Sequence, residues 1–125
     1  MPSKKRMTVL IALIVMVIVI VSLFRSRQWM SKQVYMGAGR RLSERLTPEQ
    51  QMKYGEELRY TLDKFWSFYE KELISQNDLT DVVEKMKRLG RKREVENMEL
   101  FDFIGYVSRI YTDAMHEYHE KTLTQ

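Results

Sequence analysis

Two histidines near the C-terminus have the spacing of metal ligands. Residues 115–120 read MHEYHE, so His116 and His119 are three positions apart and Glu120 follows them directly. On a helix, side chains three residues apart are neighbours, and such a pair with a carboxylate can bind Zn²⁺ or Cu²⁺. The same residues are also typical of a solvated helix face near a chain end. We predict no bound metal and no cofactor, and retain His116, His119 and Glu120 as the side chains to test.

No other arrangement in the sequence is typical of an active site. There is no cysteine, no glycine-rich phosphate loop and no pattern of paired buried carboxylates. Activated serine or cysteine nucleophiles need a base held in the right position, and no pattern here indicates one. We therefore expect a protein that is not an enzyme and has no small-molecule substrate.

A basic run and two tyrosines are the candidate contacts with a partner. Residues 85–93, KMKRLGRKR, contain six cations and end with Arg91, Lys92 and Arg93. Cations at a helix C-terminus complement the helix dipole, which accounts for such a run without any partner. Lipid head groups or an acidic partner are the alternative. We expect Tyr60 and Tyr106 on the polar backs of their helices, where exposed aromatic side chains can anchor a partner.

Residues 7–24, MTVLIALIVMVIVIVSLF, form an apolar run without charge, proline or glycine. Eighteen residues at about 1.5 Å per residue span about 27 Å, close to the hydrocarbon thickness of a bilayer. A cleaved signal peptide is the alternative, but the run exceeds the usual apolar core of about 7–15 residues. It also ends in SLFRSR, which lacks a small-x-small cleavage site. We predict an uncleaved transmembrane helix over residues 7–24.

Basic and aromatic residues flank this run on both sides. Long cationic side chains can reach lipid phosphates, and Trp and Tyr favour the membrane interface. The predicted membrane-anchoring residues are Lys4, Lys5, Arg6, Arg25, Arg27, Trp29 and Tyr35. The three cations in the tail 1–6 favour a cytoplasmic N-terminus and an external C-terminal domain, whereas the larger number of cations after the run favours the reverse. We favour the first orientation.

Charge is distributed unevenly along the chain. Residues 25–46 carry six cations and one anion, and residues 47–125 carry twelve cations and sixteen anions. The sequence pI of about 9.3 is therefore set by the membrane flanks, and it does not indicate nucleic-acid binding. A basic segment next to a bilayer is attracted to anionic lipid.

The segment after the apolar run is predicted to be helical throughout. We expect a basic juxtamembrane helix and hinge over 25–46, with the hinge at MGAGRR (36–41), because glycine lowers helix propensity. Thr47, Pro48 and Gln50 then form the pattern of a capping box, which predicts a helix to about Ser75.

Two more helices complete the predicted bundle domain, 47–125. A short helix capped by Asn77 or Asp78 ends at Gly90, and a long one runs from about Lys92 to Lys121. The long helix has an apolar arc about 180° wide, which suits a helix that contacts two neighbours. This arc includes Leu100, Phe101, Phe103, Ile104, Val107, Ile110, Tyr111, Ala114, Met115 and Tyr118. The predicted fold class is all-α: one N-terminal transmembrane helix followed by a small bundle of two long helices and one short helix.

A short motif at the start of the bundle resembles that of a known family. Leu46-Thr47-xx-Gln50 resembles the LTxxQ motif of the small helical periplasmic stress proteins of the Spy and CpxP group. Some relatives in that group are membrane-anchored metal sensors. The resemblance implies a membrane-tethered, extracytoplasmic helical protein with a metal-sensing or chaperone-like function.

These features predict one function and leave one alternative open. The anchor, the basic flank and the helical bundle predict a single-pass membrane protein that acts as a non-catalytic accessory or scaffold subunit of a larger membrane protein complex. Its partners would be membrane lipids and the other subunits, not nucleic acid. The alternative is the LTxxQ-like metal-sensing or chaperone-like protein.

Overall fold

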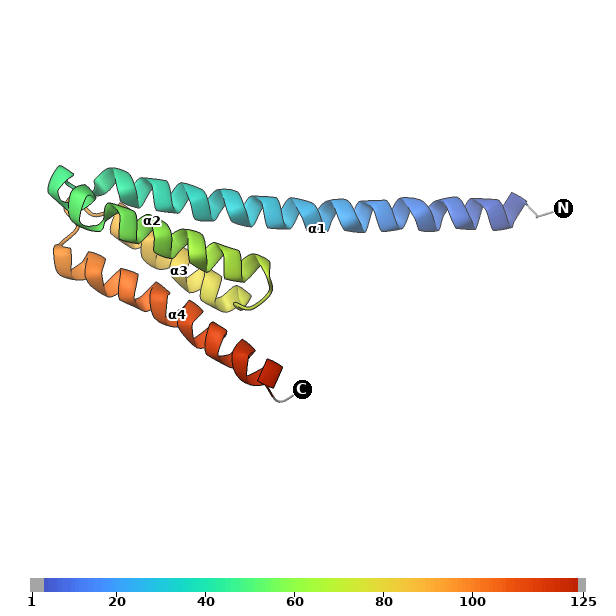
Figure 1. Ribbon diagram of the computed structural model, residues 1–125. Coiled ribbons are helices and arrows are strands. Elements are labelled where there is room, and N and C mark those ends of the chain that lie inside the picture. The colour runs from blue at the N-terminus through green and yellow to red at the C-terminus, as the bar shows by residue number, and fades with distance from the viewer. Residues whose placement is uncertain (1–3, 124–125) are drawn as a thin grey trace. The chain divides into compact units, whose positions relative to one another are not determined.

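The computed structural model describes residues 4–123 and contains four helices and no strand over that range (Figure 1). The helices are α1 (Lys4–Arg45), α2 (Pro48–Glu70), α3 (Gln76–Gly90) and α4 (Asn97–Leu123). The prediction of an all-α chain is therefore confirmed. The chain forms two compact units, Met1–Tyr35 and Met36–Gln125, and α1 contributes to both.

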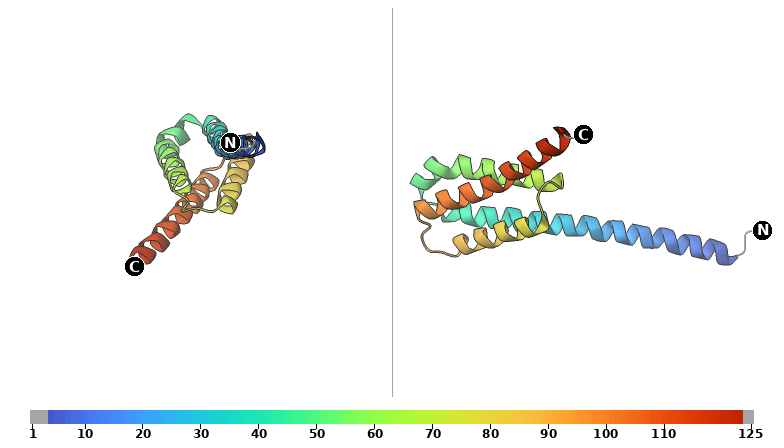
Figure 2. Two further views of the ribbon diagram at one scale, coloured as in Figure 1. Left: turned by 90° about the vertical axis from the view of Figure 1, so that its right-hand side faces the viewer. Right: turned by 90° about the horizontal axis from the view of Figure 1, so that it is seen from below.

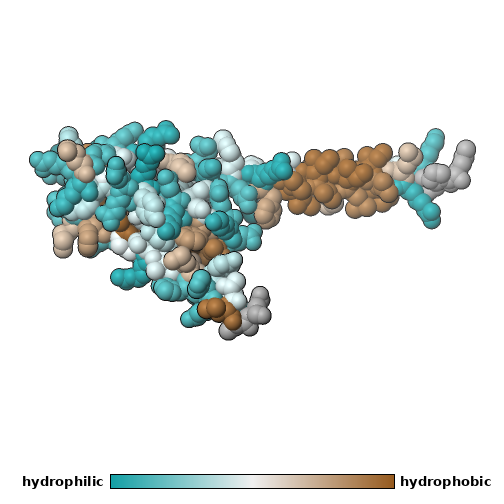
Figure 3. Space-filling model, in the orientation of Figure 1, coloured by the Kyte–Doolittle hydropathy of each residue, from teal (hydrophilic) through white to brown (hydrophobic). Residues whose placement is uncertain are grey.

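The first unit is the apolar part of α1. Every side chain of residues 7–24 is exposed, and these residues form the continuous hydrophobic stretch in Figure 3. In the described range, α1 is the one helix long and apolar enough to cross a membrane. Many of its residues are β-branched, which weakens a helix in water, but in lipid a helix satisfies every backbone N–H within the segment. The structure thus contains one candidate membrane-spanning helix, near the N-terminus.

Helix α1 passes through the predicted hinge at 36–41 without a break and ends at Arg45. A Cβ atom on Gly39 would lie 3.4 Å from Leu62 Cδ1 and 3.9 Å from Met86 Sδ. Gly39 therefore keeps the α1 backbone close to α2 and α3. Glycine has a low helix propensity, which is why the sequence predicts a hinge here. In the structure Gly39 instead allows close packing between helices.

The last turns of α1 belong to the core of the second unit. Ala38 and Leu42 are buried on one face of the helix, and Leu46, the residue after its end, is buried at the same spacing of four residues. They join a core whose largest fully buried side chains in this unit are Phe65, Leu42, Met86, Leu100, Val82 and Val107. The bundle is therefore built from four helical segments, one more than predicted, because the basic segment 25–46 also carries this apolar face.

Helices α2 and α4 lie alongside each other and run in the same direction (Figures 1 and 2). Gln50 at the start of α2 is hydrogen-bonded to Asn97 at the start of α4, and the rings of Phe68 and Tyr111 are stacked 5.9 Å apart further along. Helix α3 also packs against α4. We call the end of the bundle formed by residues 40–52 and 87–101 the junction end, since α1 leads into α2 there and α3 leads into α4.

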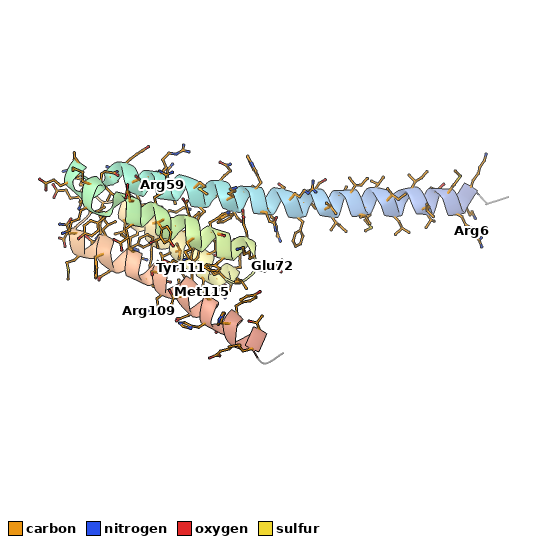
Figure 4. All side chains as sticks on the ribbon, in the orientation of Figure 1. Arg6, Arg59, Glu72, Arg109, Tyr111 and Met115 are labelled. Atoms are coloured by element: carbon orange, nitrogen blue, oxygen red, sulfur yellow. The ribbon has the colours of Figure 1, made fainter. Side chains whose placement is uncertain are left out.

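Helix α2 ends earlier than predicted, at Glu70 instead of Ser75. Glu72 has φ 62°, the left-handed conformation that usually selects glycine at this position. The Glu72 N–H donates to the Tyr69 carbonyl and the Leu73 N–H donates to the Phe68 carbonyl, both at 3.0 Å. These two bonds form the Schellman motif that terminates a helix. Figure 4 shows Glu72 in this turn.

Helices α3 and α4 also begin away from their predicted positions. Ser75 caps α3, because its Oγ accepts from the Asp78 N–H at 3.2 Å, so the predicted caps Asn77 and Asp78 are wrong. The predicted end of α3 at Gly90 is confirmed. Helix α4 starts at Asn97 instead of Lys92, and residues 91–96 form a loop that buries Val95.

Candidate functional site

Gln50 organises the junction end. Its Oε1 accepts from the Thr47 N–H at 3.0 Å and its own N–H donates to Thr47 Oγ1 at 3.2 Å, so the predicted capping box is confirmed. The buried side chain also donates from Nε2 to the Val95 carbonyl at 2.6 Å and to Asn97 Oδ1 at 2.9 Å. The glutamine of the LTxxQ-like stretch therefore holds the loop 91–96 against the start of α2.

Cations from two separate segments meet beside this loop. The Arg45 Nε donates to the Gly90 carbonyl at 3.0 Å, and a Cβ on Gly90 would lie only 3.6 Å from the Arg41 Cβ. The end of α1 is thus in contact with the end of α3. We call the resulting surface the basic cap and define it as the exposed side chains of Arg41, Arg45, Arg88, Arg91, Lys92 and Arg93.

One member of the basic cap is paired with a carboxylate of α4. Lys92 Nζ forms a salt bridge and a hydrogen bond with Glu99 Oε2, and this bond lowers the pKa of Glu99 below its ordinary value. Within residues 4–123, none of the five arginines of the cap forms an ion pair. Arg91, Lys92 and Arg93, predicted as partner contacts, are therefore exposed in the loop, with two of them available to an external anion.

The two tyrosines predicted as partner anchors differ in their surroundings. Tyr60 is 60% exposed, and its hydroxyl accepts a hydrogen bond from Lys64 Nζ at 3.0 Å, which raises the pKa of Lys64. Tyr106 is half-buried, with Lys85 Nζ 3.6 Å from its ring centroid. Burial raises the pKa of Tyr106, and the charges of Asp81 and Asp78 raise it further. Residues of α3 lie against the side chain of Tyr106, which was expected on a solvent-exposed face. Of the two tyrosines, Tyr60 is the exposed one.

Three apolar side chains of α4 that were expected in the core are exposed instead. Phe101, Met115 and Tyr118 are 63%, 44% and 52% exposed. Met115 and Tyr118 belong to the C-terminal part of α4, which diverges from α2 and α3, so the bundle does not cover them (Figures 1 and 4). Phe101 is exposed near the start of the helix. The sequence signal for this surface is the unusually wide apolar arc, which predicts contact with two neighbouring helices along its whole length.

The remaining predicted residues lie on the surface, with one exception. His116, His119 and Glu120 are exposed, and in residues 4–123 no three His, Cys, Asp or Glu side chains are grouped to hold a metal ion. The anchoring candidates Lys4, Lys5, Arg6, Arg25, Arg27 and Trp29 are exposed. Tyr35 is buried, and its place in an interfacial belt stays a prediction.

Comparison of the chain with protein-family models, curated proteins and solved structures finds no match. No relative therefore indicates a function, and a functional proposal depends on the chain's own residues.

Proposed function

We propose that this chain is a single-pass membrane protein that acts as a non-catalytic accessory or scaffold subunit of a larger membrane protein complex. The observation that supports it most directly is the exposed apolar helix at residues 7–24, which has no polar face to present to water. Apolar residues of this type each favour membrane insertion by about 0.3–0.6 kcal/mol near the helix centre, and no charge in the run opposes them.

The anchor remains attached in the mature protein under this proposal. Lys4, Lys5 and Arg6 stay on the cytoplasmic side and the bundle lies outside, because a short cationic tail is difficult to translocate. Exposed Arg25, Arg27 and Trp29 come directly after the apolar run, where long cationic and aromatic side chains can contact lipid head groups.

The bundle is the part that docks on other subunits. Its surface displays the basic cap at the junction end, the exposed Tyr60 and the apolar side chains of Phe101, Met115 and Tyr118. Arginine, methionine and aromatic residues are enriched in protein–protein interfaces. This combination supports protein docking more than it supports catalysis on a small molecule.

Purification of a tagged full-length chain in mild detergent tests the proposal. We expect other membrane proteins to co-purify in fixed stoichiometry and to be identified by mass spectrometry. As a control, the same purification is made from cells carrying the tag on an unrelated single-pass protein. Recovery of the chain alone and monodisperse would contradict the accessory-subunit function.

A further inference from the structure

The basic cap and the residues beside it carry more positive charge than the negative ends of the α1 and α3 helix dipoles can offset. Residues 40–45 and 87–93 together contain eight Lys or Arg and one Glu, and the Arg45–Gly90 hydrogen bond brings the two segments into contact. A helix C-terminus carries a partial charge of about −0.5, so two such ends offset about one cation. Lys92 has its own carboxylate partner in Glu99. The remaining cations repel one another unless an external anion lies among them.

The chemistry of the cap favours carboxylates presented by a folded partner. Five of the six cations of the cap are arginines, whose planar guanidinium groups can bind a carboxylate through two parallel hydrogen bonds. The exposed acids Glu44, Glu94 and Glu96 lie in and beside the same segments. A uniformly anionic surface, such as a nucleic acid or a lipid bilayer, would place negative charge against these glutamates as well as against the cations, whereas a polypeptide can match a mixed pattern of charge.

Apolar side chains at the junction end add to this preference. Met52 and Met98 are exposed near the starts of α2 and α4, and the Gln50–Asn97 hydrogen bond holds these two helix starts together. Flexible methionine side chains adapt to the surface of a protein partner. In Figure 3 this end of the bundle, at the left, combines hydrophilic with moderately hydrophobic side chains.

We infer that the basic cap is the docking site for an acidic segment of a partner polypeptide. This inference rests on the proposed function and specifies the chemistry of the partner at one surface. The cap is already assembled in the free chain, because the Arg45–Gly90 contact and the Gln50 hydrogen bonds fix the ends of α1 and α3 and the loop 91–96. A partner with carboxylates at helical spacing pairs with Arg88, Arg91 and Arg93 and leaves the fold unchanged.

The test uses the full chain in nanodiscs of neutral lipid and a fluorescent synthetic peptide with glutamate at every fourth position. We expect the Arg88→Gln, Arg91→Gln, Arg93→Gln triple variant to bind this peptide about tenfold more weakly, since three exposed charge pairs at about 0.5 kcal/mol each correspond to a factor of about ten. The matched control is the triple variant Lys53→Gln, Arg59→Gln, Arg109→Gln, which removes the same charge from exposed sites outside the cap. It should bind the peptide as the unchanged chain does.

Two competing probes complete the experiment: single-stranded DNA of equal formal charge and nanodiscs containing phosphatidylserine. Tighter binding of either probe than of the peptide would overturn the inference, as would an equal loss of peptide binding in the two triple variants. Co-purification from membranes then separates the two proposals. If subunits remain bound to the cap variant as well as to the control, the acidic docking site is wrong and the accessory function stands. If the peptide result holds but no subunit co-purifies with the unchanged chain, the accessory function is wrong.

Discussion

The side chain of Gln50 joins the start of α2 to a segment about 45 residues further along the chain. It completes the cap of α2 at Thr47 and donates to Val95 and Asn97 at the end of the loop before α4. A capping pattern in a sequence indicates only the first of these bonds. The other two depend on a loop about 45 residues away, so the sequence alone does not reveal that this glutamine connects two parts of the bundle.

We predict that Gln50→Ala lowers the free energy of unfolding by about 2–3 kcal/mol, because it removes a cap interaction and leaves a buried carbonyl unpaired. Gln50→Glu separates the two effects: a carboxylate still accepts from the Thr47 N–H but has no proton to donate to Val95. Urea denaturation of the full chain in detergent, followed by tryptophan fluorescence, measures both. The control is Gln51→Ala at the exposed neighbouring position, and an equal loss there would contradict a special role for Gln50.

The Lys92–Glu99 pair predicts a specific pH dependence. Since Lys92 lowers the pKa of Glu99, the pair stabilises the fold at pH values above the ordinary glutamate pKa of about 4.5. That contribution disappears as the pH falls through the lowered pKa. Lys92→Gln should therefore raise the pKa of Glu99 toward its ordinary value, measured by carbon NMR of the labelled carboxyl group. Lys87→Gln, an exposed cation of the last turn of α3, should leave it unchanged.

At the scale of the elements, helix identity is easier to predict than helix ends. Thr47, Pro48 and Gln50 are unambiguous, and α2 starts as predicted. The segment 75–78, Ser-Gln-Asn-Asp, offers three good caps, and in the structure Ser75 is the one whose side chain accepts from the third residue of the helix, Asp78. Residues 91–96 contain no proline or glycine, so the sequence predicts a helix from Lys92. In the structure these residues form a loop, and α4 begins only at Asn97. The burial of Val95 and the hydrogen bond from Gln50 to its carbonyl hold these residues in the loop conformation. Both depend on residues that are distant in the sequence, so a local pattern does not reveal them.

The basic cap is predictable only in part for the same reason. The run ending in Arg93 is evident in the sequence, but the charge of Arg41 and Arg45 indicates a membrane flank. Their position beside Gly90 depends on the buried face formed by Ala38, Leu42 and Leu46. The four-residue spacing of these apolar side chains is the signal that indicates packing in the bundle.

Two glycines of α1 provide a matched test of whether residues 36–41 act in packing or as a hinge. Gly39→Leu should destabilise the bundle by about 1–3 kcal/mol, because its side chain enters space held by Leu62 and Met86. A Cβ on Gly37 would have no neighbour within 4 Å, and Gly37→Leu should stabilise the helix by up to about 1 kcal/mol. Thermal denaturation in detergent gives both values. Equal destabilisation by the two variants would favour a hinge.

At the scale of the whole molecule, the proposed function needs the apolar helix to persist in the mature chain. An anchor and a signal sequence share a basic tail and an apolar run, and the exposed helix 7–24 is compatible with both. They differ in the chain that remains after processing. Without residues 1–24, the described range contains no helix long and apolar enough to cross a membrane, and the chain would not stay in the membrane fraction by itself.

We predict that the mature chain retains its N-terminal segment and resists extraction with alkaline carbonate. Intact mass of the purified protein reports cleavage directly. Ile14→Arg with Val17→Arg places two charges near the centre of the run, each costing about 2.5–3.5 kcal/mol of insertion free energy, and should move the chain to the soluble fraction. The control is the double variant Ser67→Arg, Thr80→Arg at exposed positions of the bundle, which should leave the chain in the membrane fraction. An intact mass that corresponds to a chain beginning after Phe24 would exclude the anchor. The bundle would then reach a membrane complex only through its docking surfaces.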